Sequence, residues 1–362
     1  MIKRDIPKIR FYSYQGAWTE KRIADMVKIS AGGDVDKIKL KESGKYPVVA
    51  NALTNKGIIG FYDDFKVNAP AVTVTGRGDV GYAVARHENF TPVVRLLTLQ
   101  SENIDVDYLE NQINSMRILN ESTGVPQLTA PQLGNYKMYH PEIDEQSAIG
   151  SLFRTLDDLL ASYKDNLANY QSLKETMLSK MFPKAGQTVP EIRLAGFEGE
   201  WERNSLSDVC TINSGRDYKH LKDGDIPVYG TGGYMLSVNE KLSDEDAIGI
   251  GRKGTIDKPY LLLAPFWTVD TLFYVTCKVG YDLNYLFLIF QKVRWKKFDE
   301  STGVPSLSKK TIEKVVSKFP SLPEQQAIGA YFSNLDNLIN SHQEKISQLE
   351  TLKKKLLQDM FI

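Results

Sequence analysis

The sequence predicts an α+β protein built from two similar lobes, each followed by a long helix. Two observations carry this prediction. The stretch Glu121–Phe182 returns without a gap as Glu300–Phe361, with roughly one position in three identical. Short β-rich runs bounded by Gly, Pro and Asn precede a helical periodicity in each copy. One structural unit therefore occurs twice in the chain.

Length and composition place the chain among ordinary soluble globular proteins. Its 362 residues are enough for two domains with separate cores, and 42% are hydrophobic against 25% charged. The apolar runs are too short to span a bilayer, and the N-terminus lacks the apolar core of a signal peptide. We therefore expect a cytoplasmic protein with no membrane partner. The isolated Cys210 and Cys277 suit a reduced compartment as small buried hydrophobes.

The formal net charge is zero, from 45 basic and 45 acidic residues. This balance neither supports nor excludes a nucleic-acid partner, because local clusters govern contacts with a phosphate backbone.

Each copy has a fixed entry, a variable middle and a fixed exit. The entry residues Pro7, Ile9, Arg10, Gly16 and Trp18 are matched by Pro190, Ile192, Arg193, Gly199 and Trp201. We expect the two tryptophans to lie in the core. Between entry and exit the copies differ in both sequence and length. The copies cover about 1–184 and 185–362.

The variable middles read as mixed α/β domains. The runs Ala71–Thr75, Val93–Leu99 and Thr271–Thr276 predict strands. One helix per copy is expected next, with Asp107 and Asn284 as candidate N-caps.

The exit of each copy predicts a long helix. Apolar residues recur at alternating steps of three and four over Ile149–Met181 and again over Ile328–Met360. The stripe is interrupted at Lys174, His342 and Lys353, and prolines that mark helix starts stand at Pro141 and Pro323. Each helix is about 50 Å long at 1.5 Å per residue. We expect the two helices to pair with each other; the alternative is that each packs only on its own lobe.

A search for catalytic motifs favours a binding protein. The glycine-rich segment Gly76–Gly81 lacks the Lys-Ser or Lys-Thr of a phosphate loop and the acidic partner of a dinucleotide site. Four histidines form no metal-binding pattern, and neither an amino-methyltransferase tetrapeptide nor a serine elbow is present. The absence of these motifs does not exclude an activity, but it favours a binding protein, and no metal ligand is predicted.

Two repeated blocks point to a known family. Ser122–Pro126 and Ser301–Pro305 both read Ser-Thr-Gly-Val-Pro, and Pro141–Gly150 and Pro320–Gly329 share Pro-x-x-x-Glu-Gln-x-Ala-Ile-Gly. With a lobe before them and a heptad helix after them, these blocks resemble the DNA specificity subunit of type I restriction–modification systems. The resemblance spans nearly the whole chain, with one small departure: Asp144 stands where the second block has Pro323.

The resemblance implies a domain order. It places target-recognition domains at 1–142 and 185–322, a central spacer helix at 143–184 and a C-terminal spacer helix at 323–362. In the family the helices pair as an antiparallel coiled coil with pseudo-two-fold symmetry.

The resemblance also implies a function without catalysis by this chain. Each lobe would read one half of an asymmetric bipartite target in double-stranded DNA, and the helices would set the spacing. The implied partners are a modification subunit, expected in two copies, and a restriction motor–nuclease subunit. S-adenosylmethionine, ATP and Mg²⁺ would bind those partners, and adenine would be extruded for methylation. No cofactor is expected on this chain.

Several loops offer candidate DNA contacts. Arg77 and Arg252–Lys253 lie in glycine-rich loops, where they can meet phosphates or guanine edges or stay solvated or salt-bridged. The shared hydroxyl residues are candidates for phosphates or for purely structural turns: Ser122, Thr123, Ser301 and Thr302. Further candidates in diverged or basic loops are Asn55, Lys56, Lys219, His220, Tyr229, Thr231, Tyr234, Lys309 and Lys310.

Two other classes stay open on the residues alone. The chain could be a scaffold that bridges two protein partners without binding DNA. It could also be a nuclease or methyltransferase with an unrecognised site.

Overall fold

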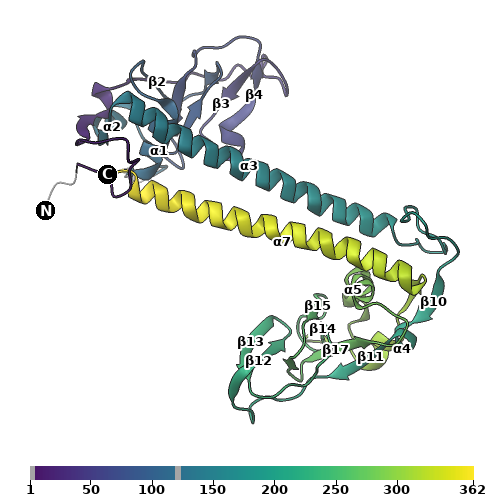
Figure 1. Ribbon diagram of the computed structural model, residues 1–362. Helices are drawn as coiled ribbons and strands as arrows, with labels where there is room; N and C mark the ends of the chain where they lie inside the picture. The colour runs from purple at the N-terminus through teal and green to yellow at the C-terminus, as the bar shows by residue number, and fades with distance from the viewer. Residues whose placement is uncertain (1–4, 119–123) are drawn as a thin grey trace. The chain divides into compact units, whose positions relative to one another are not determined.

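The computed structural model describes residues 5–118 and 124–362 (Figure 1). The chain divides into two compact units. Unit 1 comprises the described residues of Met1–Asp165 together with Glu344–Ile362, and unit 2 is Asn166–Gln343. The predicted α+β class with long helices is confirmed.

Unit 1 holds the first lobe. Its elements, in chain order, are β1 (Thr19–Arg22), β2 (Lys28–Ala31), β3 (Tyr46–Val49), β4 (Ile58–Tyr62), β5 (Ala71–Val74), β6 (Ala83–Arg86), β7 (Thr91–Pro92), β8 (Leu97–Gln100), α1 (Val106–Ser115), α2 (Ala130–Asn135), β9 (Lys137–His140) and the start of α3 (Ile143–Lys180).

Unit 2 repeats this order with small additions. Its elements are β10 (Glu202–Ser205), α4 (Leu206–Val209), β11 (Cys210–Ser214), β12 (Asp223–Gly230), β13 (Gly233–Val238), β14 (Ala247–Gly251), β15 (Tyr260–Leu262), β16 (Trp267–Thr268), β17 (Leu272–Cys277), α5 (Leu283–Lys292), α6 (Lys309–Glu313), β18 (Val316–Phe319) and the start of α7 (Leu322–Asp359).

The sheets have the same topology in both units. Each unit has a four-stranded antiparallel sheet, in the orders β2-β8-β5-β6 and β11-β17-β14-β15. Each also has a three-stranded sheet, β4-β3-β7 or β13-β12-β16, whose last pair is parallel. A two-stranded ribbon, β1-β9 or β10-β18, joins the entry of the lobe to the segment before the long helix. The variable middles thus share one fold despite their diverged sequences.

The short helices α1 and α5 begin earlier than expected. Their N-caps are Asp105 and Asp282, whose carboxylates accept hydrogen bonds from the main-chain N–H of Tyr108 and Tyr285 at 2.9 and 2.8 Å. The prediction of Asp107 and Asn284 as caps was therefore wrong, because both lie inside the first turn.

Two other sequence-based boundaries shift. The expected strand over Val93–Leu99 starts only at Leu97, because Arg95 adopts a left-handed φ of 68° that breaks the extended run. Pro323 is the second residue of α7 rather than a residue ahead of it. A proline is accommodated there because the first-turn N–H groups have no partner inside the helix.

The Glu-Gln-x-Ala-Ile-Gly block fastens each long helix to its lobe. The buried Gln146 accepts from the N–H of Asp105 at 3.2 Å and donates to Pro141 O at 2.8 Å. Gln325 makes the matching bonds to Asp282 and Pro320, at 3.1 and 2.9 Å. These contacts explain why the block recurs in both copies.

The glycine that ends each block allows close packing. A Cβ atom on Gly150 would lie 2.3 Å from the capping carboxylate of Asp105, and one on Gly329 would lie 2.6 Å from that of Asp282. Only a residue without a side chain lets the helix approach these caps.

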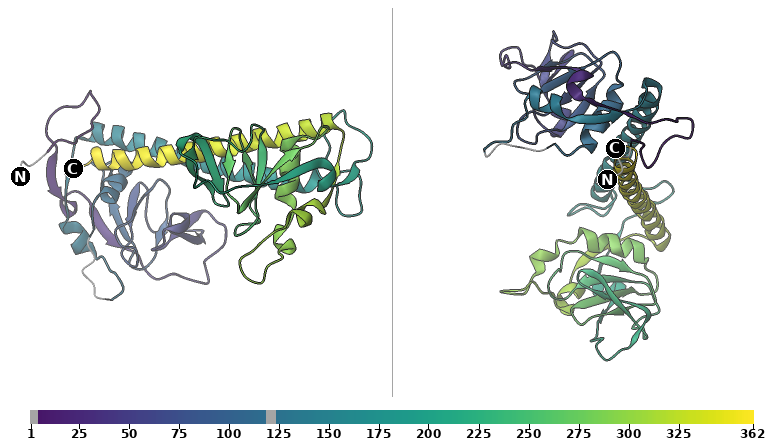
Figure 2. Two further views of the ribbon diagram at one scale, coloured as in Figure 1. Left: turned by 90° about the horizontal axis from the view of Figure 1, so that it is seen from below. Right: turned by 90° about the vertical axis from the view of Figure 1, so that its left-hand side faces the viewer.

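The long helices pair antiparallel within each unit, as predicted. In unit 1, α7 approaches α3 through Lys353–Asp157 at 2.5 Å and Lys164–Glu350 at 2.7 Å. Figures 1 and 2 show these two helix segments side by side. In unit 2 the matching ion pair is Lys174–Asp336 at 2.6 Å.

The polar interruptions of the heptad stripe have a physical reason. Lys174 and Lys353 are the cations of the interhelical ion pairs, so they occupy stripe positions without leaving a charge unpaired. His342 lies edge-on to Tyr170, with ring centroids 5.1 Å apart. The alternative in which each helix packs only on its own lobe is thereby excluded.

Each long helix starts in one unit and ends in the core of the other. Phe182, just after α3, stacks on Tyr285 at 5.5 Å in unit 2. Phe361, just after α7, lies 5.7 Å from Tyr108 in unit 1. The predicted core position of the tryptophans is confirmed, since Trp18 and Trp201 are each 3% exposed.

Three general features complete the description. Burial raises the pKa of the Cys210 and Cys277 thiols to about 12, which keeps them protonated. None of the helices in the described part of the chain has the length and apolarity needed to cross a membrane. The described residues contain no cluster of three or more His, Cys, Asp or Glu suited to a metal ion.

Candidate nucleic-acid interface

The structure brings together two segments that the sequence singled out separately. In unit 2 the loop after β14 runs antiparallel to the Ser-Thr-Gly-Val-Pro segment. Gly254 N donates to Pro305 O at 2.8 Å, and Leu307 N donates to Arg252 O at 2.9 Å. Arg252 and Lys253 therefore lie beside Ser301 and Thr302 on one exposed surface.

The same pairing occurs in unit 1. Gly78 N donates to Pro126 O at 3.1 Å, and Leu128 N donates to Gly76 O at 3.0 Å. Arg77 lies at the centre of this pairing, where its main chain forms an isolated antiparallel β-bridge with Gln127, and its side chain is exposed. Ser122 and Thr123 lie outside the described residues.

Glycine is required at the root of both basic loops. A Cβ atom on Gly76 would lie 2.1 Å from Arg95 O, and one on Gly251 would lie 2.0 Å from Thr255 O. Gly78 and Gly254 have φ values of 77° and 99°, which other residues rarely adopt. The glycine-rich pattern thus builds a tight turn that presents the arginine.

Asp299 holds the Ser-Thr-Gly loop of unit 2 in shape. Its Oδ1 accepts from Ser301 N at 3.0 Å, Ser301 Oγ at 2.8 Å and Ser306 N at 2.9 Å. These hydrogen bonds lower the pKa of Asp299, and those from the main-chain N–H groups of Ser306 and Ser301 have the largest effect. The Ser301 hydroxyl therefore has a structural partner, whereas Thr302 is exposed on the rim.

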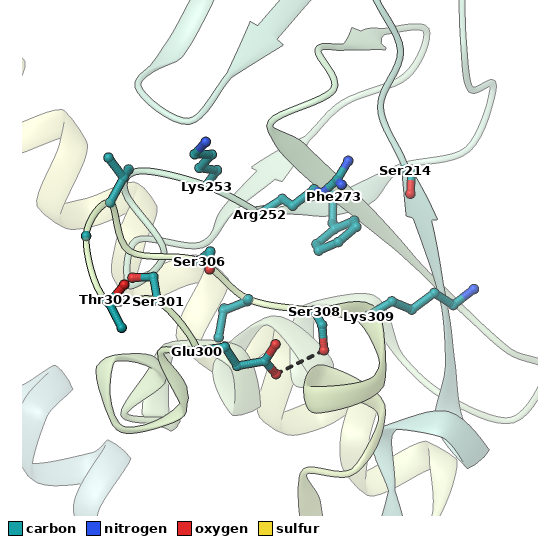
Figure 3. A pocket seen from close by; sticks show the side chains of 13 residues that line it. Ser214, Arg252, Lys253, Phe273, Glu300, Ser301, Thr302, Ser306, Ser308 and Lys309 are labelled. Atoms are coloured by element: carbon teal, nitrogen blue, oxygen red, sulfur yellow. Dashed lines mark hydrogen bonds between the residues drawn. The ribbon is translucent and has the colours of Figure 1, made fainter.

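An open hollow of about 840 Å³ lies between these segments (Figure 3). Arg252 and Lys253 line it on one side, and Ser301, Thr302 and Lys309 line it on the other. Its carboxylate, Glu300, accepts from Ser308 Oγ at 3.0 Å and also from Thr311 Oγ1. Three cations against one hydroxyl-bonded carboxylate favour an anionic ligand.

Two contacts orient the guanidinium of Arg252. Its Nη1 donates to Asp270 O at 3.3 Å, and its guanidinium lies over the Phe273 ring at 6.0 Å. Such stacking orients the planar group while the remaining N–H groups stay available for a phosphate or a base.

The β12–β13 hairpin lies next to this hollow. Thr231 is in its two-residue turn, and its Oγ1 would be 3.7 Å from a Cβ on Gly254. Tyr229 and Tyr234 face each other across the hairpin with ring centroids 6.3 Å apart, and Tyr234 is 62% exposed. The structure therefore groups Tyr229, Thr231 and Tyr234 with the Arg252–Lys253 loop.

Unit 1 places its own hairpin loop in the matching position. Asn51 Oδ1 accepts from Gly76 N at 2.8 Å, which ties the β3–β4 loop to the Arg77 loop. Asn55 and Lys56 are exposed in this loop and have φ values of 48° and 49°. The loop that carries them is thus tied to the Arg77 loop through Asn51.

The remaining candidates are spread around the rim. Lys219 and His220 are exposed in the loop between β11 and β12, with His220 edge-on to Trp267 at 6.1 Å. Lys309 lies 3.8 Å from Glu313, and Lys310 is exposed beside it in the short helix α6. Lys309 joins the hollow; Lys219, His220 and Lys310 are not among its lining residues.

Sequence reasoning missed the residues that shape the surface. Asp299 and Asn51 bond main-chain N–H groups of the candidate loops, and Ser214 and Phe273 line the hollow. Asp299 had a local signal, because it directly precedes the repeated stretch Glu300–Phe361. Asn51 had none, since its partner lies 25 positions away.

Known proteins resemble this chain over most of its length. The family model described as type I restriction modification DNA specificity domain matches residues 15–169 and 198–351. The specificity subunit of the type I restriction enzyme MjaVIII of Methanocaldococcus jannaschii is 21% identical over 94% of this chain and 91% of its own length.

The fold is also that of a solved protein. The S subunit of a type I restriction–modification system from M. genitalium superposes with a TM-score of 0.76 at 18% identity, over 99% of both chains. Fold, domain duplication and repeated blocks thus agree, and the chain belongs to the family of type I restriction–modification DNA specificity subunits, with two specificity domains in tandem.

Proposed function

We propose that each unit reads one half of an asymmetric bipartite target in double-stranded DNA. The observation that carries the proposal is the repeated pairing of a basic glycine loop with a Ser-Thr-Gly-Val-Pro segment, next to a hairpin that differs between the units. An interface that binds two half-sites of different sequence needs this combination of a constant frame and a variable part.

The constant frame suits the DNA backbone. Arg77, Arg252, Lys253 and Lys309 supply charge, while Ser301, Thr302 and the unplaced Ser122 and Thr123 supply hydroxyl groups for phosphate oxygens. Phosphate contacts position a protein on the duplex without reading its sequence.

The variable hairpins suit base edges. Tyr229, Thr231 and Tyr234 in unit 2 have hydroxyl groups and aromatic rings where unit 1 has Asn55 and Lys56. Asparagine pairs with adenine and lysine with guanine in the major groove, whereas threonine bonds several bases and contacts the thymine methyl group. Different residues at matching places would give different half-sites.

The helices are the proposed docking surface for a modification subunit, in two copies. Exposed apolar residues recur at equivalent helix positions in both copies: Ile143 and Leu322, Leu159 and Leu338, Leu173 and Leu352. Exposed apolar side chains at repeated positions suit two copies of one protein partner. A restriction subunit would join this assembly, and S-adenosylmethionine, ATP and Mg²⁺ would bind the partners rather than this chain.

The test uses the chain assembled with its modification subunit. Mapping methylated adenines in host DNA gives the target, and fluorescence anisotropy then measures binding to that duplex at rising salt. We expect specific binding that weakens steeply with salt. A complex that assembles but does not bind the mapped duplex would support the scaffold alternative. Methylation or cleavage by the chain alone would support an unrecognised enzyme.

A further inference from the structure

Both hairpins are held from the same place in the fold. In unit 1, Arg86 on the edge strand β6 donates from Nη2 to Lys56 O in the β3–β4 loop, at 2.6 Å. In unit 2, Tyr260 on the edge strand β15 donates from its hydroxyl to Gly230 O at the tip of β12, also at 2.6 Å. In each unit the outermost strand of the four-stranded sheet thus bonds a main-chain carbonyl of the hairpin.

Arg86 is built into the sheet rather than displayed on it. The residue is 7% exposed, and its Nε donates to the buried Thr73 Oγ1 at 3.0 Å. Burial lowers the pKa of Arg86 to about 10, which reflects the cost of keeping a charge there. This buried guanidinium donates to one hydroxyl and to one loop carbonyl, so it links the sheet to the loop.

The loop that Arg86 holds has an unusual backbone. Asn55 and Lys56 are consecutive non-glycine residues with positive φ, a conformation that is strained for residues with a side chain. The bond to Lys56 O offsets part of that strain. It therefore fixes the direction in which the exposed side chains of Asn55 and Lys56 leave the loop.

Tyr260 performs the matching task with different chemistry. Its partly buried hydroxyl bonds Gly230 O, where the hairpin pairs Gly230 with Gly233. Burial raises the pKa of this hydroxyl, so it remains a protonated donor. Its ring lies 6.1 Å from that of Tyr229, which places the bond directly beside a candidate reading residue.

We propose that Arg86 and Tyr260 are positioning residues that set the two recognition hairpins and so determine half-site specificity without touching DNA. The inference rests on the proposed function of the hairpins as readers. Base readout needs side chains held within about half an ångström of the productive geometry. The difference between the two bonds, a guanidinium in one unit and a phenol in the other, lets each hairpin keep its own geometry.

Tyr260→Phe and Arg86→Met test the proposal in the complete complex with the modification subunit. Each variant is measured on the mapped target and on two duplexes in which one half-site is replaced. We expect Tyr260→Phe to lose about tenfold in discrimination at the half read by unit 2 only, as for one lost hydrogen bond. Arg86→Met should lose discrimination at the other half only.

Matched controls separate positioning from general stability. Tyr281→Phe also removes a phenol hydroxyl from unit 2, but that hydroxyl accepts at 3.3 Å from Asn204 on β10, a strand that pairs with β18 and not with the hairpin. It should leave both half-sites unchanged. Arg86→Lys keeps one donor and should restore part of the discrimination that Arg86→Met loses.

Hydrogen exchange gives a second readout. Amides of residues 229–234 should exchange faster in Tyr260→Phe while those of residues 52–58 do not change, and Arg86→Met should show the reverse. If Arg86→Met does not fold, Tyr260→Phe decides alone, since it removes one oxygen atom. Unchanged discrimination, or an equal loss at both halves, overturns the proposal. A wild-type complex without preference for the target overturns the proposed function instead.

Discussion

Arg193 donates two parallel hydrogen bonds to Glu324, from Nε to Oε1 and from Nη2 to Oε2, both 2.7 Å long. The Glu324 side chain is 1% exposed. Arg10 and Glu145 form the same forked pair in unit 1, at 2.6 and 2.7 Å. In both copies the arginine also bonds the carbonyl of the matching glycine, Gly199 or Gly16. This pair fastens the entry of each lobe to the start of its following helix.

Arg193→Met should destabilise the protein by about 3–5 kcal/mol, because it leaves the buried Glu324 carboxylate without its cation. Urea unfolding followed by circular dichroism measures the change. Lys184→Met is the control, since the Lys184–Glu191 pair is exposed and such pairs contribute about 0–1 kcal/mol. Equal effects of the two substitutions would contradict this prediction.

Glu110 should make stability fall as pH rises. Burial, and then the charge of Asp157, raises the pKa of Glu110 from 4.5 to about 7. Between these values the unfolded chain releases a proton that the folded chain retains, so the free energy of unfolding decreases by about 3 kcal/mol. Glu110→Gln should match wild type at pH 4.5 and exceed it at pH 8 in urea unfolding. Glu102→Gln, at an exposed site, should gain nothing, and a pH-independent effect of Glu110→Gln would argue against the assignment.

Gly329→Ala should destabilise unit 2 by about 1–3 kcal/mol, because the new methyl group would lie 2.6 Å from the Asp282 carboxylate. Thermal unfolding measures the loss. Gly303→Ala provides the control, since a Cβ at Gly303 meets no atom within 4 Å. A harmless Gly329→Ala would mean that the helix start can move away from its cap.

Lys253→Ala should weaken binding of the assembled complex to the mapped duplex and reduce the salt slope by about 0.9, the value for one phosphate contact. Lys241→Ala removes the same charge from unit 2 at a surface pair with Asp244 and should leave the slope unchanged. Anisotropy titrations at several salt concentrations measure both. An identical slope for wild type and Lys253→Ala would remove Lys253 from the interface.

Leu338→Asp should reduce the number of modification subunits bound per chain from two to one, because a charge is costly inside an apolar interface. Leu159→Asp should do the same at the equivalent position, and the double variant should bind none. Native mass spectrometry reads the stoichiometry. Asn337→Asp adds a charge at the neighbouring position and serves as control. Two bound subunits in the double variant would place the docking surface elsewhere.

Much of the fold could be predicted from the sequence, because local periodicity and internal repetition determine it. The stripes over Ile149–Met181 and Ile328–Met360 predicted the paired helices, and the repeated blocks predicted two lobes. The caps Asp105 and Asp282 were misassigned by two residues, since several polar residues near a helix start can cap it and only the backbone decides.

The site was only partly predictable for a different reason. Arg252 and Ser301 stood out as candidates, but their adjacency depends on pairing between segments about fifty residues apart. The roles of Arg86 and Tyr260 could not be predicted. An arginine or a tyrosine in a strand has the same sequence context whether or not its side chain bonds a hairpin carbonyl. Long-range main-chain contacts of this kind leave no periodic trace.

Because α3 ends on Tyr285 and α7 ends on Tyr108, each recognition lobe depends on a helix that the other lobe begins. We expect damage to one lobe to loosen both helices and so to weaken the core of the second lobe. A destabilising substitution should therefore abolish methylation by the assembled complex rather than relax its choice of half-site. Mutations that damage either half are therefore expected to inactivate the whole protein. Exchange of hairpin residues, in contrast, could change the target without loss of activity.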